Sequence, residues 1–86
     1  MESYKLLIKP AAAKELDRIP RKDLERIVQR IQGLLENPRG PGSQKLSGQE
    51  QYRIRQGDYR VVYQIDENDK LVLIVKVAHR SDVYRS

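Results

Sequence analysis

Residues 52–63 carry the feature that most limits how this chain can fold: two runs of alternating residues on either side of the dipeptide Gly57-Asp58. A Gly-X dipeptide between two strand-like runs predicts a β-hairpin closed by a two-residue type II′ turn. In that register Gln56 faces Tyr59, and every later pair along the hairpin follows from it. One face is then apolar and the other is basic, with these members: Tyr52, Ile54, Val61 and Tyr63 on the first, Arg53, Arg55 and Arg60 on the second.

The basic face of this hairpin is electrostatically unfavourable as it stands. The predicted register places Arg55 directly opposite Arg60, and like charges in that position destabilise a sheet. Guanidinium groups bind phosphate oxygens in pairs and stay charged at neutral pH, so this face is predicted to bind a phosphate. The alternative is a solvated strand face on which the arginines pair with nearby carboxylates, namely those of Glu50, Asp58 or Asp66.

The segment before the hairpin predicts a strand and two helices. Residues 3–9 read as a strand, and residues 10–18 as a helix that Pro10 can open and Pro20 ends. Residues 21–36 carry apolar side chains at i, i+3, i+4 and i+7 spacing, which predicts a second, amphipathic helix. Two antiparallel helices joined around Pro20 follow, and the composition of residues 38–43 is that of a loop.

The segment after the hairpin completes a single α+β domain over residues 1–86. The hairpin strands are expected near residues 50–56 and 59–66, and a third strand over 71–78 makes them a meander. That third strand is apolar at both parities, which is typical of a central strand covered on both faces. The predicted fold is a mostly antiparallel, twisted sheet with the helix pair on one face and a short C-terminal turn or helix, for which Ser81 is a candidate cap.

Composition narrows the classes of function. The net charge is +5 and the isoelectric point is about 9.7, which favours acidic partners such as nucleic acid. The chain has no cysteine and a single histidine, so we expect no disulfide, no metal site and no cofactor. No apolar run approaches the length of a membrane span and no signal-peptide pattern is present, so we expect a cytoplasmic protein.

The C-terminal segment adds further candidate site residues. His79, Arg80 and Tyr84 follow the central strand and offer a titratable group, a cation and a ring that can stack on a base. The alternative is a frayed tail. Lys76 shares the parity of Arg80 and could either join the basic face or extend its amine past a sheet edge.

Other cations lie on the polar helix faces, where solvation is the default and contact with RNA backbone is the alternative: Lys14, Arg18, Arg21, Lys22, Arg26 and Arg30.

Several enzyme chemistries lack their residues here. The glycine-rich stretch Gly40-Pro-Gly42 has no Lys-Ser/Thr after it, so it is no nucleotide-binding P-loop, and no Ser-His-Asp or Cys-His set stands out. Metal-free RNA cleavage by the neighbouring 2′-hydroxyl needs only charge neutralisation, in-line orientation and a proton for the leaving oxygen. A basic site with one histidine and one tyrosine is compatible with that reaction.

The motifs 52–63 and 79–85, with Lys45-Leu46 between the second helix and the hairpin, resemble the RelE branch of the RelE/ParE toxin superfamily. The resemblance spans nearly the whole chain. It implies a toxin of a type II toxin–antitoxin pair that cuts mRNA in the ribosomal A site without metal. It also implies a cognate antitoxin that wraps the toxin and blocks or distorts its site.

The resemblance also implies roles for individual residues. Arg53 and Arg55 match the family's basic hairpin positions and Arg60 its transition-state arginine. In the C-terminal segment, Arg80 matches the family's tail arginine and Tyr84 matches its tail tyrosine. The proton for the leaving oxygen is expected to come from either Arg80 or His79. Lys45 and Lys76 are expected to contact substrate. Relatives often carry lysines where this chain has Arg53 and Arg55, and arginine is a poor base because its pKa exceeds about 12. Phosphate binding is therefore the role expected of these two.

Two other functions stay open for this fold. The first is a ParE-like toxin that inhibits DNA gyrase by binding. Such binding has no stated need for all of the arginines together with Tyr84. The second is a basic RNA-binding protein without turnover.

Overall fold

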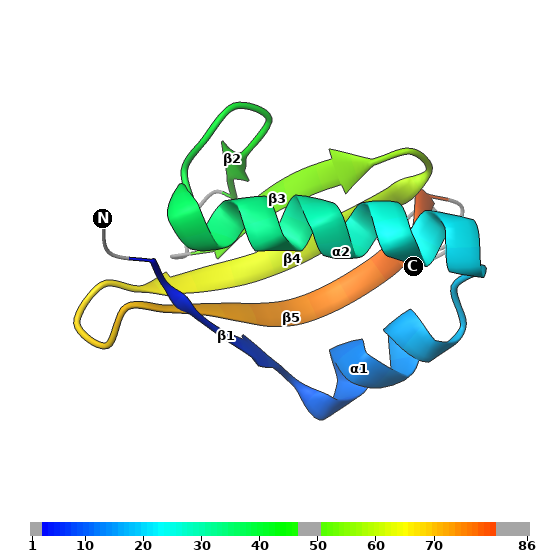
Figure 1. The fold of residues 1–86 in the computed structure, drawn as a ribbon, viewed down its shortest axis with the longest axis horizontal. Coiled ribbons are helices and arrows are strands. Elements are labelled where there is room, and N and C mark those ends of the chain that lie inside the picture. Colours follow the sequence, from blue (N-terminus) through cyan, green and yellow to red (C-terminus); the bar gives the residue numbers. More distant parts are fainter. Residues whose placement is uncertain (1–2, 47–50, 81–86) are drawn as a thin grey trace.

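A computed structural model describes residues 3–46 and 51–80 of the chain. It confirms an α+β architecture, a five-stranded sheet with two helices (Figure 1). In chain order the elements are β1 (Lys5–Ile8), α1 (Pro10–Asp17), α2 (Arg21–Glu36), β2 (Gln44–Lys45), β3 (Gln51–Gln56), β4 (Tyr59–Asp66) and β5 (Leu71–His79). The predicted C-terminal turn or helix and its candidate cap Ser81 lie outside the described residues.

The sheet has the strand order β1-β5-β4-β3-β2 and is mostly antiparallel, as predicted. Only β1 and β5 pair in parallel within the described part of the chain, with Lys5 opposite Leu71 and Ile8 opposite Ile74. The short strand β2 was not predicted. It pairs with β3 through Gln44 opposite Arg53 and Lys45 opposite Tyr52.

The two helices begin and end close to the predicted residues. Pro10 stands at the first position of α1, where its missing N–H costs nothing, and α2 has the predicted bounds. Figure 1 shows α2 running back across one face of the sheet, while α1 lies beside the far part of β5. The connection at Pro20 therefore makes the predicted helical hairpin.

The core lies between α2 and the sheet. The buried side chains come from α1, α2, β3, β4 and β5: Ala12, Ile27, Ile31, Leu34, Tyr52, Ile54, Val61, Tyr63, Val72, Ile74 and Val77. All four residues of the predicted apolar hairpin face are among them. Tyr63 is fully buried, and its hydroxyl donates to the Pro38 carbonyl at 2.6 Å, so its one polar group is satisfied.

A β-bulge interrupts the pairing of β4 with β5. Val62 lies opposite Lys76, but Tyr63 lies opposite Ile74, so Val75 is an extra residue on β5. The core-facing residues of β5 therefore change parity, from Val72 and Ile74 before the bulge to Val77 after it. The predicted coverage of both faces is confirmed in part, since on the other face Leu71 and Leu73 are half-buried and Ala78 is buried. The strand has apolar residues at both odd and even positions partly because the bulge changes which of them face the core.

Candidate functional site

The hairpin of β3 and β4 forms with the predicted register, pair by pair from Gln56 opposite Tyr59 to Tyr52 opposite Tyr63. Gly57 has a φ of +60°, and the only described non-glycine residue with positive φ is Lys70. Positive φ at the first turn residue alone is the pattern of a type II′ turn. Arg53, Arg55 and Arg60 consequently share the face opposite the core.

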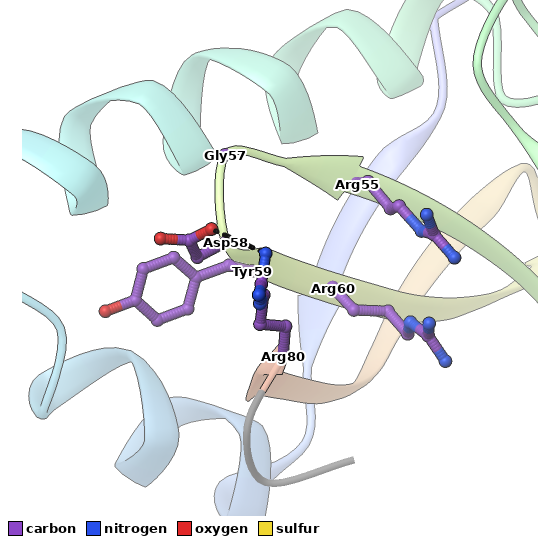
Figure 2. Close-up of a pocket in the computed structure, with 6 residues that line it drawn as sticks. All are labelled: Arg55, Gly57, Asp58, Tyr59, Arg60 and Arg80. Atoms are coloured by element: carbon purple, nitrogen blue, oxygen red, sulfur yellow. Dashed lines mark ion pairs between the residues drawn. The ribbon is translucent and has the colours of Figure 1, made fainter. Parts of the chain in front are cut away.

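A hollow of about 290 Å³ lies at the tip of this hairpin. Figure 2 shows the side chains of Arg55 and Arg60 extending in the same direction from the two strands. Within the described part of the chain, the hollow is lined by Arg55, Gly57, Asp58, Tyr59, Arg60 and Arg80. The hairpin and the end of β5 thus bring three guanidinium groups to one depression.

Two contacts with Asp58 position Arg80. The Arg80 backbone N–H donates to the Asp58 carbonyl at 2.7 Å, and its Nη1 lies 3.9 Å from Asp58 Oδ1 (Figure 2). Both side chains are more than half exposed, so the ion pair adds little stability. Its effect is geometric, because it ties the end of β5 to the hairpin turn.

The hairpin arginines have no acidic partner among the described residues. No ion pair links Arg53, Arg55 or Arg60 to a carboxylate in residues 3–46 and 51–80. The predicted alternative therefore fails for two of its carboxylates: Asp58 pairs with Arg80, and Asp66 accepts from the Asp69 backbone N–H. The third, Glu50, lies outside the described residues.

The positive charge of this face affects the pKa of Arg53. Partial burial lowers the pKa of its guanidinium, and the positive charges of Arg60 and Arg55 lower it further. Its Nη2 donates to the side-chain oxygen of Gln44 on β2. A neutral amide thus orients Arg53 without neutralising it.

His79 and Arg80 occupy different places. His79 pairs with Tyr59 across the sheet and packs edge-on against its ring, with centroids 5.2 Å apart and planes at 83°. Among the described residues that line the hollow, Arg80 is present and His79 is not. The geometry therefore brings Arg80 to the hairpin arginines.

The remaining predicted site residues lie away from the hollow or outside the described chain. Lys45 pairs with Tyr52, which puts it on the opposite face from the arginines. Lys76 shares their face through Val62, and its Nζ lies 3.9 Å from Glu15 Oε2. Of its two predicted places, Lys76 thus takes the one on the basic face, and its contact with substrate stays a prediction. Tyr84 lies outside the described residues.

Two residues near the site were not among the predicted site residues. Gln44 reaches Arg53 only because β2 forms, and a two-residue strand leaves no periodic signal in a sequence. Arg30 on α2 reaches the same region, where its position on a polar helix face predicted solvation by default and contact with RNA backbone as the alternative. No local pattern could have found either, since both contacts depend on tertiary packing.

The described residues offer neither a metal-ion site nor a membrane-spanning helix. No group of three or more His, Cys, Asp or Glu side chains there could hold a metal ion. Neither helix there is long and apolar enough to cross a membrane.

Comparison with known proteins decides the family. Residues 6–84 match the family model described as ParE toxin of type II toxin-antitoxin system, parDE. The chain is 39% identical to Toxin RelE of Mycobacterium tuberculosis over 84 residues, which cover 95% of this chain and 87% of the relative. It belongs to the RelE branch of the RelE/ParE toxin superfamily. This RelE-family toxin is also 31% identical to Toxin RelG of the same organism over 86 residues, 95% of this chain and 97% of that protein.

Solved structures of RelE proteins share the fold of this toxin. The isolated Escherichia coli RelE toxin superposes with a TM-score of 0.82 at 30% identity, covering 95% of this chain and 92% of that one. The toxin of the intact E. coli RelBE toxin–antitoxin complex superposes with a TM-score of 0.81 at 28% identity, covering 90% and 96%. The family resemblance of the hairpin is therefore matched by the fold as a whole.

Proposed function

We propose that this RelE-family toxin is a metal-independent endoribonuclease that cuts mRNA in the ribosomal A site. The observation that carries the proposal is the hollow at the hairpin tip, which Arg55, Arg60 and Arg80 all line. Arg55 and Arg60 have no carboxylate partner within residues 3–46 and 51–80, so their charge is available to a ligand. A phosphodiester matches three guanidinium groups in charge and in hydrogen-bonding geometry.

The reaction needs only the strand itself and a polarising site. The ribose 2′-oxygen bonds to the adjacent phosphorus and its proton passes to solvent, while the bond from phosphorus to the 5′-oxygen breaks and that oxygen gains a proton. The products are a cyclic phosphate and a 5′-hydroxyl. Negative charge grows on the phosphorane oxygens, where preorganised cations in a sheltered site stabilise it most effectively.

Each arginine has its own part in this proposal. Arg55 binds the scissile phosphate, and Arg53, on the same strand face but outside the first hollow, adds positive charge that favours ionisation of the 2′-hydroxyl. Neither takes the proton itself, because arginine is too weak a base. Arg60 stabilises the phosphorane. Arg80 supplies further positive charge beside the leaving oxygen, since it lines the hollow and His79 does not. Tyr84 is assigned to stacking on a base.

The proposal extends to partners. Cleavage at this site depends on how the substrate is oriented, so the rate rises when a ribosome holds the mRNA in a fixed conformation. A toxin that acts on ribosomes in this way works in the cytoplasm. We further propose a cognate antitoxin that covers the arginine face. Solved relatives include an E. coli RelBE toxin–antitoxin complex, and the net charge of +5 favours an acidic partner segment.

A second candidate function is inhibition of DNA gyrase. The matching family model carries the description ParE toxin, which supports this alternative. Inhibition by binding alone does not require charges that converge on a single hollow. The arginine arrangement therefore favours cleavage, and non-catalytic RNA binding is the remaining alternative.

The decisive experiment adds the toxin to translating ribosomes carrying a defined mRNA and maps the cuts by primer extension. We expect codon-phased cuts, and a loss of about 10²-fold or more in cutting rate with Arg60→Ala. Arg21→Ala is the matched control, because this arginine has a side chain 92% exposed on α2. Intact mRNA together with impaired DNA supercoiling by gyrase would establish the alternative instead.

A further inference from the structure

A second basic hollow lies beside the first. Its volume is about 360 Å³, and within the described part of the chain it is lined by Arg30, Gly42, Gln44, Arg53 and Arg55. Arg55 lines both hollows, so the two are neighbours on one surface. Its described lining has three arginines and no acidic residue, a composition that suits an anion.

Arg30 is held in place by the loop that follows α2. Its Nη2 donates to the Pro41 carbonyl at 3.0 Å, which directs the guanidinium toward that loop. Gly42 has a φ of +87°, and a Cβ at this position would collide with Arg30 Nη2. Glycine is therefore favoured here by its backbone angle, while a Cβ would displace only the end of the flexible Arg30 side chain.

Gln44 organises the other side of this hollow. Its side-chain oxygen accepts from Arg53 Nη2, so Arg53 is oriented by a neutral group. Three guanidinium groups from α2 and β3 then share one depression and repel one another. An arrangement with that electrostatic cost is relieved by a bound anion.

We propose that the second hollow binds a second RNA phosphodiester, next to the one in the first hollow, so that the toxin holds the RNA backbone at two points. This inference rests on the proposed function, which places the scissile phosphate in the first hollow. The second phosphate comes from the same RNA strand or from ribosomal RNA beside it. In both cases the same Arg30 and Arg53 contacts recognise it.

A second backbone contact would act on binding more than on chemistry. Arg30 lines only the second hollow, so its interaction with the backbone is the same in the ground state and in the transition state. Removal of such a contact raises KM and leaves kcat nearly unchanged. Arg60, which lines only the first hollow, should show the reverse pattern.

The test measures binding of 2′-O-methyl RNA, which cannot be cut, by fluorescence anisotropy at low salt. A dinucleotide carries one phosphodiester, and a tetranucleotide carries three. We expect wild-type toxin to prefer the tetranucleotide, and Arg30→Gln to weaken tetranucleotide binding about tenfold while leaving dinucleotide binding unchanged. The slope of log K against log salt for the tetranucleotide should become shallower by about 0.7, the value for one phosphate contact on a single strand.

Two further variants control for folding and for general charge loss. Arg21→Gln removes the same charge from the start of α2 and should bind both oligonucleotides as wild type does. Gln44→Glu places a carboxylate in the second hollow at an exposed position and should reproduce the selective loss without touching the Arg30 contact with Pro41.

A second arm identifies the source of the phosphate by measuring toxin binding to vacant ribosomes. A loss with Arg30→Gln on ribosomes but not on the tetranucleotide assigns the phosphate to ribosomal RNA. Unchanged binding in both arms overturns the second subsite. That failure is separate from failure of the proposed function, since a toxin that binds both RNAs as expected but leaves mRNA intact on translating ribosomes keeps the subsite and loses the nuclease.

Discussion

Gly57 is the residue on which the geometry of the site most directly depends. Its φ of +60° closes the hairpin turn, and the next residue, Asp58, holds Arg80 through two contacts. A side chain at Gly57 would meet no atom within 4 Å, so any penalty for substitution comes from the backbone angle alone. The conformational freedom of one residue thus links the turn to the end of β5.

We expect Gly57→Ala to lower the free energy of unfolding by about 1 kcal/mol, the cost of positive φ for a residue with a Cβ. Urea unfolding measures this. Gly33→Ala is the control, because Gly33 lies inside α2 with open space around it and should gain about 0.5–1 kcal/mol from the same change. Equal effects of the two substitutions would contradict the assigned role of the turn.

The end of β5 is supported by a helix where the sheet has no strand. Pairing with β1 stops at Ile8 opposite Ile74, and α1 lies beside the rest of that edge (Figure 1). Glu15 on α1 accepts from the Val77 backbone N–H at 2.9 Å, and its other oxygen lies 3.9 Å from Lys76 Nζ. A carboxylate therefore satisfies the strand group that a neighbouring strand would otherwise bond.

Glu15→Ala should destabilise the protein by about 2 kcal/mol, because it leaves the Val77 N–H without its acceptor. Glu15→Gln keeps an acceptor oxygen and should cost less than about 1 kcal/mol, since only the partly exposed ion pair with Lys76 is lost. Hydrogen exchange at the Val77 amide is the direct measurement. Protection lost equally in both variants would show that the charge, rather than the hydrogen bond, supports this edge.

At the scale of the whole molecule, Glu67 joins segments that are far apart in the chain. Its Oε1 accepts from the Tyr4 hydroxyl at 2.6 Å and from Arg39 Nη1 at 3.3 Å, and its Oε2 lies 3.9 Å from Lys70 Nζ. Arg39 in turn donates through Nε to the Tyr52 hydroxyl at 3.1 Å. The N-terminal strand region, the loop after α2 and the β4–β5 turn are thereby connected at one end of the sheet.

This network should make stability depend on pH in a defined direction. The hydrogen bond from Tyr4 has the largest effect and lowers the pKa of the Glu67 carboxyl, and desolvation opposes it. Arg39 and Lys70 lower the pKa further, so the net shift is downward. Because the folded pKa lies below the unfolded one, the stabilisation is fully present above the unfolded pKa. It is lost as the pH falls through the folded value.

Glu67→Gln should therefore be less stable than wild type near pH 7, and the two should converge as the pH falls into acid through the lowered pKa of the Glu67 carboxyl. Urea unfolding across this range measures the difference. Glu25→Gln is the matched control, because that carboxylate makes an exposed ion pair within α2 and its loss should matter little at any pH. A difference that persists unchanged into acid would show that Glu67 acts through packing instead of charge.

The features that could be predicted from the sequence are local ones. The hairpin register needs only a two-residue turn and strict alternation, so all pairs from Gln56–Tyr59 to Tyr52–Tyr63 could be listed in advance. The bounds of α2 follow from apolar spacing and from a proline at each end. The bulge at Val75 and the strand β2 could not be predicted, since each depends on how neighbouring strands twist and pair.

The same division holds for the site. Alternation around Gly57 by itself determined that Arg53, Arg55 and Arg60 share one face, because side-chain direction along a strand has a period of two. Only the tertiary structure decided which distant cations join them. Arg80 reaches the first hollow because β5 ends beside Asp58, while His79 packs against Tyr59. Arg30 reaches the second because the loop after α2 folds back onto its guanidinium, a contact between segments that no local pattern encodes.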